Sequence, residues 1–171
     1  MFSSDRTTSS ISQIARLLLD PGNTVNVAKA HLLLGLEAES RNDWDDAAEN
    51  YLRIVELAPA DNMVLYFGHN NRACALLQLK RFDEARAHCV AAIKVDDSRH
   101  QAYENLGLAF EALGQAAEAA VCFLDAARKS AGDQKAWIHL QQLVSRNPEL
   151  LVQSPDLLTT VGSTGSRSAF R

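Results

Sequence analysis

Residues 100–133 read HQAYENLGLAFEALGQAAEAAVCFLDAARKSAGD. Apolar residues recur at helical spacing on both sides of a turn at Leu113-Gly114-Gln115, and this spacing predicts two amphipathic helices. Gly107 in the first helix and Ala119 in the second have no bulk, so the two backbones can approach closely. Phe110 and Phe123 are expected to fill the space beside them. A single hairpin of this kind cannot bury its apolar face, so further copies of the pattern are expected along the chain.

The pattern recurs twice before this stretch. One copy spans residues 28–61, where Leu34-Gly35 takes the place of Leu106-Gly107, and the other spans residues 66–99. Four extra residues, Asn62 to Leu65, separate the two earlier copies. Because an α-helix turns once in about 3.6 residues, this insertion should lengthen the start of the next helix by about one turn.

The repeated unit resembles the tetratricopeptide repeat (TPR), a helix–turn–helix unit with a period of about 34 residues. Pro59 stands where the family places a proline that ends the second helix, and the run Asn71-Arg72-Ala73 resembles a variant found in the TPRs of co-chaperones. The resemblance covers about Ala28 to Arg146. It implies an all-α fold, a right-handed α-solenoid of stacked helix–turn–helix repeats.

The sequence divides into three parts. Residues 1–23 form an N-terminal segment with a short helix that Ser10 caps, residues 24–147 form the repeat domain, and residues 148–171 form a tail that should be mostly flexible. Residues 134–146 continue the phase of the repeats without a second helix. Their apolar inner face and polar outer face are typical of a capping helix.

The short N-terminal helix should place Ile11, Ile14, Leu17 and Leu18 on one apolar face. A helix of about ten residues is marginal alone in water, so it should dock on another surface. One prediction is that it covers the first repeat. The alternative is that it engages a partner or a second copy of the chain, which would make a homo-oligomer.

Composition excludes several classes of protein. The net charge of −4 and the absence of a dense Lys/Arg block argue against binding of nucleic acid. No run of about 18 apolar residues exists that could span a membrane, and the N-terminus has no signal-peptide cleavage site, so we expect a cytoplasmic protein. Cys74, Cys89 and Cys122 lack metal-ligand or disulfide spacing and are expected to be reduced.

The family resemblance also implies a site. In TPR proteins the first helix of each pair lines a concave groove, and a groove of mixed apolar and amide character suits an extended or helical peptide. The residues predicted to bind such a peptide are Lys29, Leu32, Leu36, Phe67, Asn70, Asn71, Leu77, Gln101, Asn105, Leu108 and Lys135. By phase, the same surface also receives Glu39, Cys74, Glu104, Glu111, Ile138 and Gln142.

Asn71 and Asn105 are 34 residues apart and should stack on successive first helices. An amide carries both a donor and an acceptor, so a ladder of asparagines can hold a peptide backbone of any sequence. The alternative is that these amides are solvated or tie adjacent helices together. Leu33 holds the equivalent place in the first repeat, so any ladder is short.

One well-known TPR class binds the acidic C-termini of heat-shock chaperones through a carboxylate clamp of lysine, asparagine and arginine residues. Only Asn71 matches that clamp here. The remaining clamp positions hold Leu32, Leu36, Gln101 and Asn105. A single matching residue cannot clamp a terminal carboxylate, so binding of that kind is not expected.

Catalysis finds little support in the sequence. His31 and His69 recur at the same place in two repeats, where they are expected to fill space near the helix interface rather than ligate a metal. No catalytic or phosphate-binding motif occurs. We therefore expect a non-enzymatic adaptor without cofactor or metal that binds a protein or peptide. The alternatives are a secretion-type chaperone and a self-assembling structural TPR protein.

Overall fold

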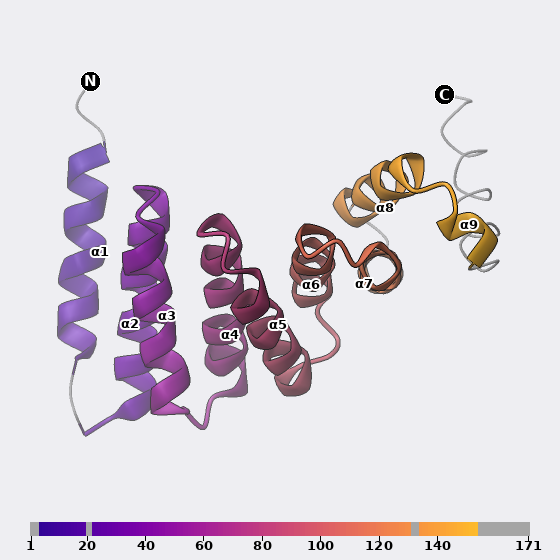
Figure 1. Ribbon diagram of the computed structural model, residues 1–171. Helices are drawn as coiled ribbons and strands as arrows, with labels where there is room; N and C mark the ends of the chain where they lie inside the picture. The colour runs from indigo at the N-terminus through magenta and orange to yellow at the C-terminus, as the bar shows by residue number, and fades with distance from the viewer. Residues whose placement is uncertain (1–3, 20–21, 131–133, 154–171) are drawn as a thin grey trace, which may run out of the picture.

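The computed structural model describes residues 4–19, 22–130 and 134–153; most of the expected flexible tail lies outside them. The described residues fold into nine α-helices that stand side by side in a row (Figure 1). Their bounds are α1 (Ser4–Leu18), α2 (Thr24–Ser40), α3 (Trp44–Leu57), α4 (Asn62–Gln78), α5 (Phe82–Val95), α6 (His100–Ala112), α7 (Ala116–Lys129), α8 (Lys135–Arg146) and α9 (Leu150–Gln153). The all-α solenoid that the sequence predicts is confirmed.

The three repeats are the pairs α2–α3, α4–α5 and α6–α7, and one turn geometry joins the helices in each pair. Asn42, Lys80 and Gly114 all have a positive φ, of 58°, 60° and 75°. In each turn the next residue donates its N–H to the carbonyl five residues earlier, as in the bond of 2.9 Å from Gln115 to Phe110. This Schellman geometry satisfies the last carbonyls of the first helix and reverses the chain.

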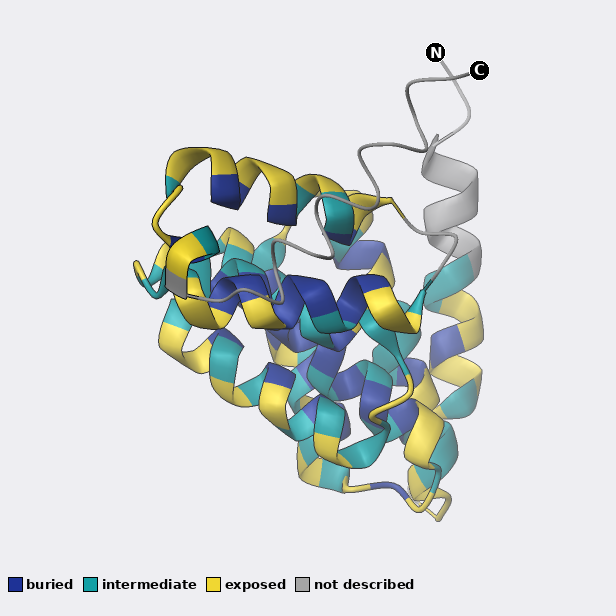
Figure 2. Ribbon diagram, turned by 90° about the vertical axis from the view of Figure 1, so that its right-hand side faces the viewer, coloured by how far each residue is buried: buried dark blue, intermediate teal, exposed yellow. Residues whose placement is uncertain are grey.

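Small residues let the two helices of a pair approach, as the sequence indicates. A Cβ added at Gly35 would lie 2.7 Å from Cζ of Tyr51, and one at Gly107 would lie 2.6 Å from Cε1 of Phe123. Both rings are fully buried. The helix faces turned toward neighbouring helices are accordingly the buried ones (Figure 2). Each ring therefore fills the space that its glycine leaves open.

The four inserted residues form the first turn of α4. The side chain of Asp61 caps this helix by accepting from the N–H groups of Met63 and Val64. The insertion thus extends the first helix of the second repeat, as its length predicts, and leaves the pairing with α5 intact.

Helix α1 differs from its prediction in two ways. It begins at Ser4 instead of following Ser10, because serine and threonine cost an α-helix only a few tenths of a kcal/mol each. Within residues 11–18, Ile11 and Leu18 of the predicted apolar face are half-buried, Ile14 and Leu17 are 51% and 84% exposed, and Ala15, which was not on that face, is buried. A small side chain allows close approach to α2, so the helix docks on Ala15.

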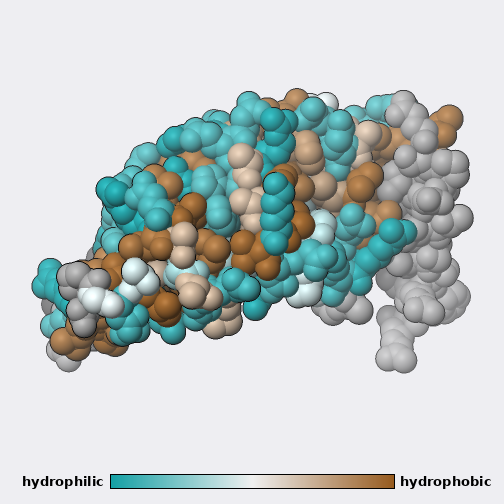
Figure 3. All heavy atoms as spheres, turned by 90° about the horizontal axis from the view of Figure 1, so that it is seen from below, coloured by the Kyte–Doolittle hydropathy of each residue, from teal (hydrophilic) through white to brown (hydrophobic). Residues whose placement is uncertain are grey.

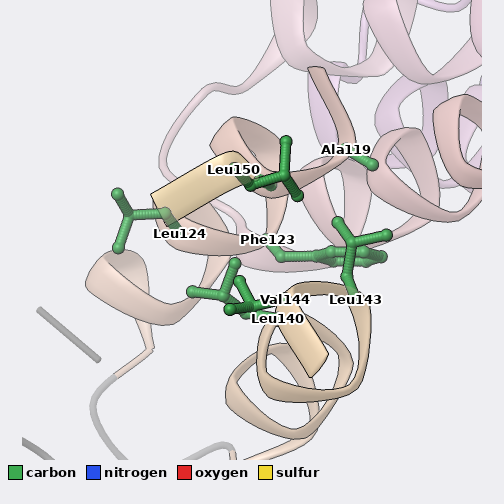
Figure 4. Packing of buried hydrophobic residues seen from close by; sticks show 8 residues of the cluster. Ala119, Phe123, Leu124, Leu140, Leu143, Val144 and Leu150 are labelled. Carbon is green, nitrogen blue, oxygen red and sulfur yellow. The ribbon is translucent and has the colours of Figure 1, made fainter. Parts of the chain in front are cut away.

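The C-terminal end of the stack is closed by α8. Phe123 and Leu124 of α7 face Leu140, Leu143 and Val144 of α8, and Leu150 of α9 joins the same cluster (Figure 4). The opposite side of α8 is exposed at Gln141, Gln142 and Ser145. Helix α8 therefore packs its apolar side on the second helix of the last repeat.

Candidate functional site

The predicted groove residues lie on α2, α4, α6 and α8, which follow one another along the stack. Apart from Asn71 and Asn105, which lie beside the others on α4 and α6, they are spaced three or four residues apart on each helix and form one stripe per helix. We call this surface the first-helix face. Its members are Lys29, Leu32, Leu36 and Glu39 on α2, Phe67, Asn70, Cys74 and Leu77 on α4, Gln101, Glu104, Leu108 and Glu111 on α6, and Lys135, Ile138 and Gln142 on α8.

Apolar side chains remain accessible on this face. Leu36 and Ile138 are 43% and 46% exposed, and Leu32, Leu77 and Leu108 are half-buried. Figure 3 shows one side of the molecule, on which hydrophobic side chains gather in patches between hydrophilic ones. The folded chain therefore leaves apolar area for contact with another molecule.

The predicted asparagine ladder is joined through a third amide. Nδ2 of Asn105 donates to Oδ1 of Asn70 at 3.2 Å, and Nδ2 of Asn70 donates to Oδ1 of Asn71 at 3.1 Å. Asn70 is only 8% exposed. The amides thus tie α4 to α6, which is the structural alternative that the sequence left open, while Asn71 and Asn105 stay half-buried.

Two carboxylates act on the centre of the first-helix face. Burial raises the pKa of the Cys74 thiol, and the nearby Glu39 of α2 and Glu104 of α6 raise it further. Burial also raises the pKa of Glu39 above its usual range. One carboxylate from each neighbouring first helix acts on the same thiol of α4. The electrostatic potential at this part of the face is therefore negative.

The Tyr51 hydroxyl lies under the same region. It is buried and makes no hydrogen bond of standard geometry to the residues that the structure describes, although the side chains of Glu39 and Asn71 lie close enough to interact with it. Burial raises the pKa of this phenol, and its neighbours Glu39, Asn71 and Cys74 also influence it.

Most charged groups elsewhere on the face are paired. Nζ of Lys29 lies 3.7 Å from Asp61, and Arg146 reaches Glu111 at 2.8 Å. Phe67 packs edge-on against Tyr66. The guanidinium of Arg99 lies 5.2 Å from the centre of the Phe67 ring. These contacts fix the outer parts of the face by interactions within the chain.

The sequence did not predict a polar cluster that lies between α4 and α5. Arg72 is buried and donates from Nη1 to the Ala48 carbonyl at 2.5 Å and from Nε to Nε2 of His88 at 3.0 Å. Since arginine can only donate, Nε2 of His88 accepts and its proton lies on Nδ1, which donates to Nδ1 of His69 at 3.1 Å. Both imidazoles are therefore neutral and serve the helix interface.

The part of the chain that the structure describes holds neither a metal-ligand cluster nor a membrane-spanning helix. Within residues 4–19, 22–130 and 134–153, no three His, Cys, Asp or Glu side chains come together in a way that could hold a metal ion. Cys74, Cys89 and Cys122 are free thiols. None of the helices in the described part is long and apolar enough to cross a bilayer.

A family model described as tetratricopeptide repeat matches residues 70–134. Heat shock protein STI1 of Saccharomyces cerevisiae is 30% identical over 134 residues, which cover 72% of this chain. The chain spans only 22% of the length of that relative. The match therefore concerns one segment of a much longer protein.

Solved structures give the same assignment. The TPR2B domain of yeast Sti1, in a complex with pHsp70, is 29% identical with a TM-score of 0.60, and the match covers 74% of this chain and 98% of that domain. The second TPR domain of human RPAP3, in a complex with the HSP70 peptide SGPTIEEVD, is 27% identical with a TM-score of 0.59, covering 64% and 88%. The family that the repeated pattern predicts is thus confirmed, and this chain is a tetratricopeptide repeat protein.

Proposed function

We propose that this chain is a non-enzymatic interaction module, a small adaptor that holds an extended peptide or a helix of a partner protein against the first-helix face. The observation that carries the proposal is the accessible apolar surface at Leu36 and Ile138 beside half-buried amides. Apolar side chains can take the anchors of a peptide, and amides can bond to its backbone. Two similar domains, of yeast Sti1 and human RPAP3, are complexed with Hsp70 or an Hsp70 peptide.

The proposed ligand is not the acidic terminus that the human RPAP3 domain holds. That peptide ends in EEVD. The clamp positions of this chain hold Leu32, Leu36 and Gln101, none of which is a cation, and the Asn105 amide is already bonded to Asn70. A carboxylate terminus would meet no positive charge there and would approach Glu39 and Glu104. The proposed peptide therefore differs in chemistry from those of the clamp class.

Selection from a displayed library of random twelve-residue peptides tests this function. The wild-type chain is expected to enrich a family of related peptides. A synthetic copy of the most enriched peptide should bind Leu36→Asp at least tenfold more weakly than wild type. The matched control is Val90→Asp on α5, because Val90 is a similarly exposed apolar residue on a second helix, and its affinity should change less than twofold. Failure to enrich any peptide, or an equal loss in both variants, would reject the proposal.

A further inference from the structure

One contact between successive first helices recurs at the C-terminal end of the row. Nδ2 of Asn105 on α6 donates to Oδ1 of Asn70 on α4 at 3.2 Å. In the same way, Nε2 of His139 on α8 lies 3.7 Å from Oε1 of Glu104 on α6. The two residues of each pair are 35 positions apart in the sequence. Helix α8 therefore lies against α6 in the register in which α6 lies against α4.

A second contact fixes this register. Nη2 of Arg146 on α8 lies 2.8 Å from Oε1 of Glu111 on α6, and these two residues are again 35 positions apart. Each contact on α6 is seven residues from the other, and the same spacing separates the partners on α8. Seven residues make about two helical turns, so the contacts fix both the position and the tilt of α8 relative to α6.

Ile138 is the exposed apolar residue that α8 adds to the first-helix face. It directly precedes His139, and it stands one repeat period after Glu104. Another side of α8 is buried meanwhile, because Leu140 and Leu143 share a hydrophobic cluster with α7. Packing on α7 therefore attaches α8 to the stack, whereas the contacts with α6 align it with the other first helices.

We infer that α8 is the fourth helix of the binding face, and that Glu104 and Glu111 hold it so that a bound peptide reaches Ile138. The two glutamates are then positioning residues, because they act on the ligand through α8. Exposed ion pairs contribute little to stability, so such contacts suit alignment of a helix better than its attachment. This inference rests on the proposed function and adds which features of the peptide are recognised.

The span of the face sets the distance between the apolar residues of the ligand. Packed helices lie about 10 Å apart, so α2 and α8, three steps apart in the row of first helices, are separated by about 30 Å. An extended chain rises about 3.3 Å per residue, so a peptide that contacts both Leu36 and Ile138 should carry apolar side chains about nine residues apart. The twelve-residue library described above is long enough to contain such peptides.

Charge reversal on α8 tests the positioning role in the full chain. The most enriched peptide should bind Arg146→Glu about fivefold more weakly than wild type, because repulsion from Glu111 moves α8 away from α6. The exchange Glu111→Arg/Arg146→Glu should restore the affinity to within about twofold of wild type. The matched control is Arg128→Glu, which should leave the affinity unchanged. Arg128 is 58% exposed against 60% for Arg146, and its partner Asp125 belongs to the same helix α7.

A double-mutant cycle separates positioning from a general loss of stability. Ile138→Ala should weaken peptide binding about fivefold in wild type and less than about twofold in Arg146→Glu, because the displaced α8 no longer offers this side chain. Leu36→Ala should weaken binding by the same factor in both proteins, since α2 does not move. A variant that had merely lost stability would still show the full loss at Ile138.

The results that overturn the inference differ from those that overturn the proposed function. An equal loss from Ile138→Ala in wild type and in Arg146→Glu, or an exchanged pair that does not restore binding, would remove the positioning role. A change of less than about twofold from Ile138→Ala in wild type would mean that the ligand does not reach α8, while weaker binding to Leu36→Asp would still support the proposed function. A library from which wild type enriches nothing would overturn both.

Discussion

At the scale of single residues, one backbone position recurs in all three repeats with unequal chemistry. Asn42, Lys80 and Gly114 each end a first helix in the left-handed region. Glycine adopts this conformation without steric cost and asparagine adopts it more readily than most residues, but lysine carries a full side chain into it. The third repeat therefore has the best residue at this turn and the second repeat the worst.

Lys80→Gly should stabilise the protein by about 1 kcal/mol, because it removes the strain of a positive φ at an exposed turn. Urea unfolding followed by circular dichroism measures the change. Gly114→Ala is the reverse control, since an added Cβ at that glycine meets nothing within 4 Å and the cost of about 1 kcal/mol is that of the backbone alone. Equal stability of Lys80→Gly and wild type would contradict this account.

Tyr51→Phe should raise the free energy of unfolding of the ligand-free protein by about 1 kcal/mol, since it removes a buried hydroxyl that makes no hydrogen bond of standard geometry. The half-buried Tyr103 is the control, and its change to phenylalanine should be within about 0.5 kcal/mol of neutral. Thermal unfolding of both variants distinguishes them. A loss of stability in Tyr51→Phe would indicate that the hydroxyl is bonded in the free protein.

At the scale of helix pairs, polar side chains join α4 and α5 at a place where the third repeat has an apolar side chain. Arg72 occupies the position that Leu106 holds in the third repeat, and it bonds to the Ala48 carbonyl and to His88. Burial lowers the pKa of His88 to about 4, and the nearby Arg72 and His69 contribute in the same direction. This pair therefore holds a histidine that stays neutral well below its ordinary pKa.

The stability of the chain should consequently depend on pH between about 4 and 6.5. In that window the unfolded chain carries a proton on His88 that the folded chain does not, so the free energy of unfolding falls as the pH falls. The contribution is about 2 to 3 kcal/mol over the window and is fully present above pH 6.5. Urea midpoints at several pH values between 4 and 8 measure it.

His88→Gln is the matched variant for that experiment. Its amide oxygen can accept from Arg72 and its NH₂ group can donate to His69, but it does not titrate. The free energy of unfolding of this variant should fall less between pH 6.5 and 4 than that of wild type. The carboxylates that also titrate in this range contribute equally to both proteins. An identical slope of stability against pH in the two proteins would remove His88 from the explanation.

The sequence predicts local pairs better than contacts between repeats. The glycine–aromatic pairs and the turns follow from spacing within one repeat, and the structure agrees. The role of Asn70 could not be predicted in the same way, because its bonds depend on how α4 and α6 lie against each other. The face that α1 buries was predicted only in part, because Ile11 and Leu18 are half-buried but Ile14 and Leu17 are exposed. Close approach to α2 favoured the small Ala15 instead.

At the scale of the whole molecule, each helix contacts mainly its neighbours in the row, so the two ends need their own covers. Helix α1 covers α2 with a polar tie: Oγ of Ser12 donates to the buried Glu37 carboxylate at 2.6 Å, and Arg41 approaches the same side chain at 3.3 Å. Helix α8 covers α7 with apolar contacts. The N-terminal end is thus covered through polar contacts and the C-terminal end through apolar contacts.

This arrangement predicts that damage at one end stays local. Leu140→Ala removes a fully buried side chain from the contact of α8 with Phe123 and should cost about 3 kcal/mol of local stability. Because stability in a solenoid is a sum of repeat and nearest-neighbour terms, amide hydrogen exchange should accelerate in α7 and α8 and change little in α2 and α3. Val121→Ala, at an exposed position of α7, is the control and should leave exchange unchanged throughout. If Leu140→Ala accelerated exchange equally in all three repeats, the chain would unfold as one cooperative unit, and the first-helix face would be lost whenever its C-terminal cap opens.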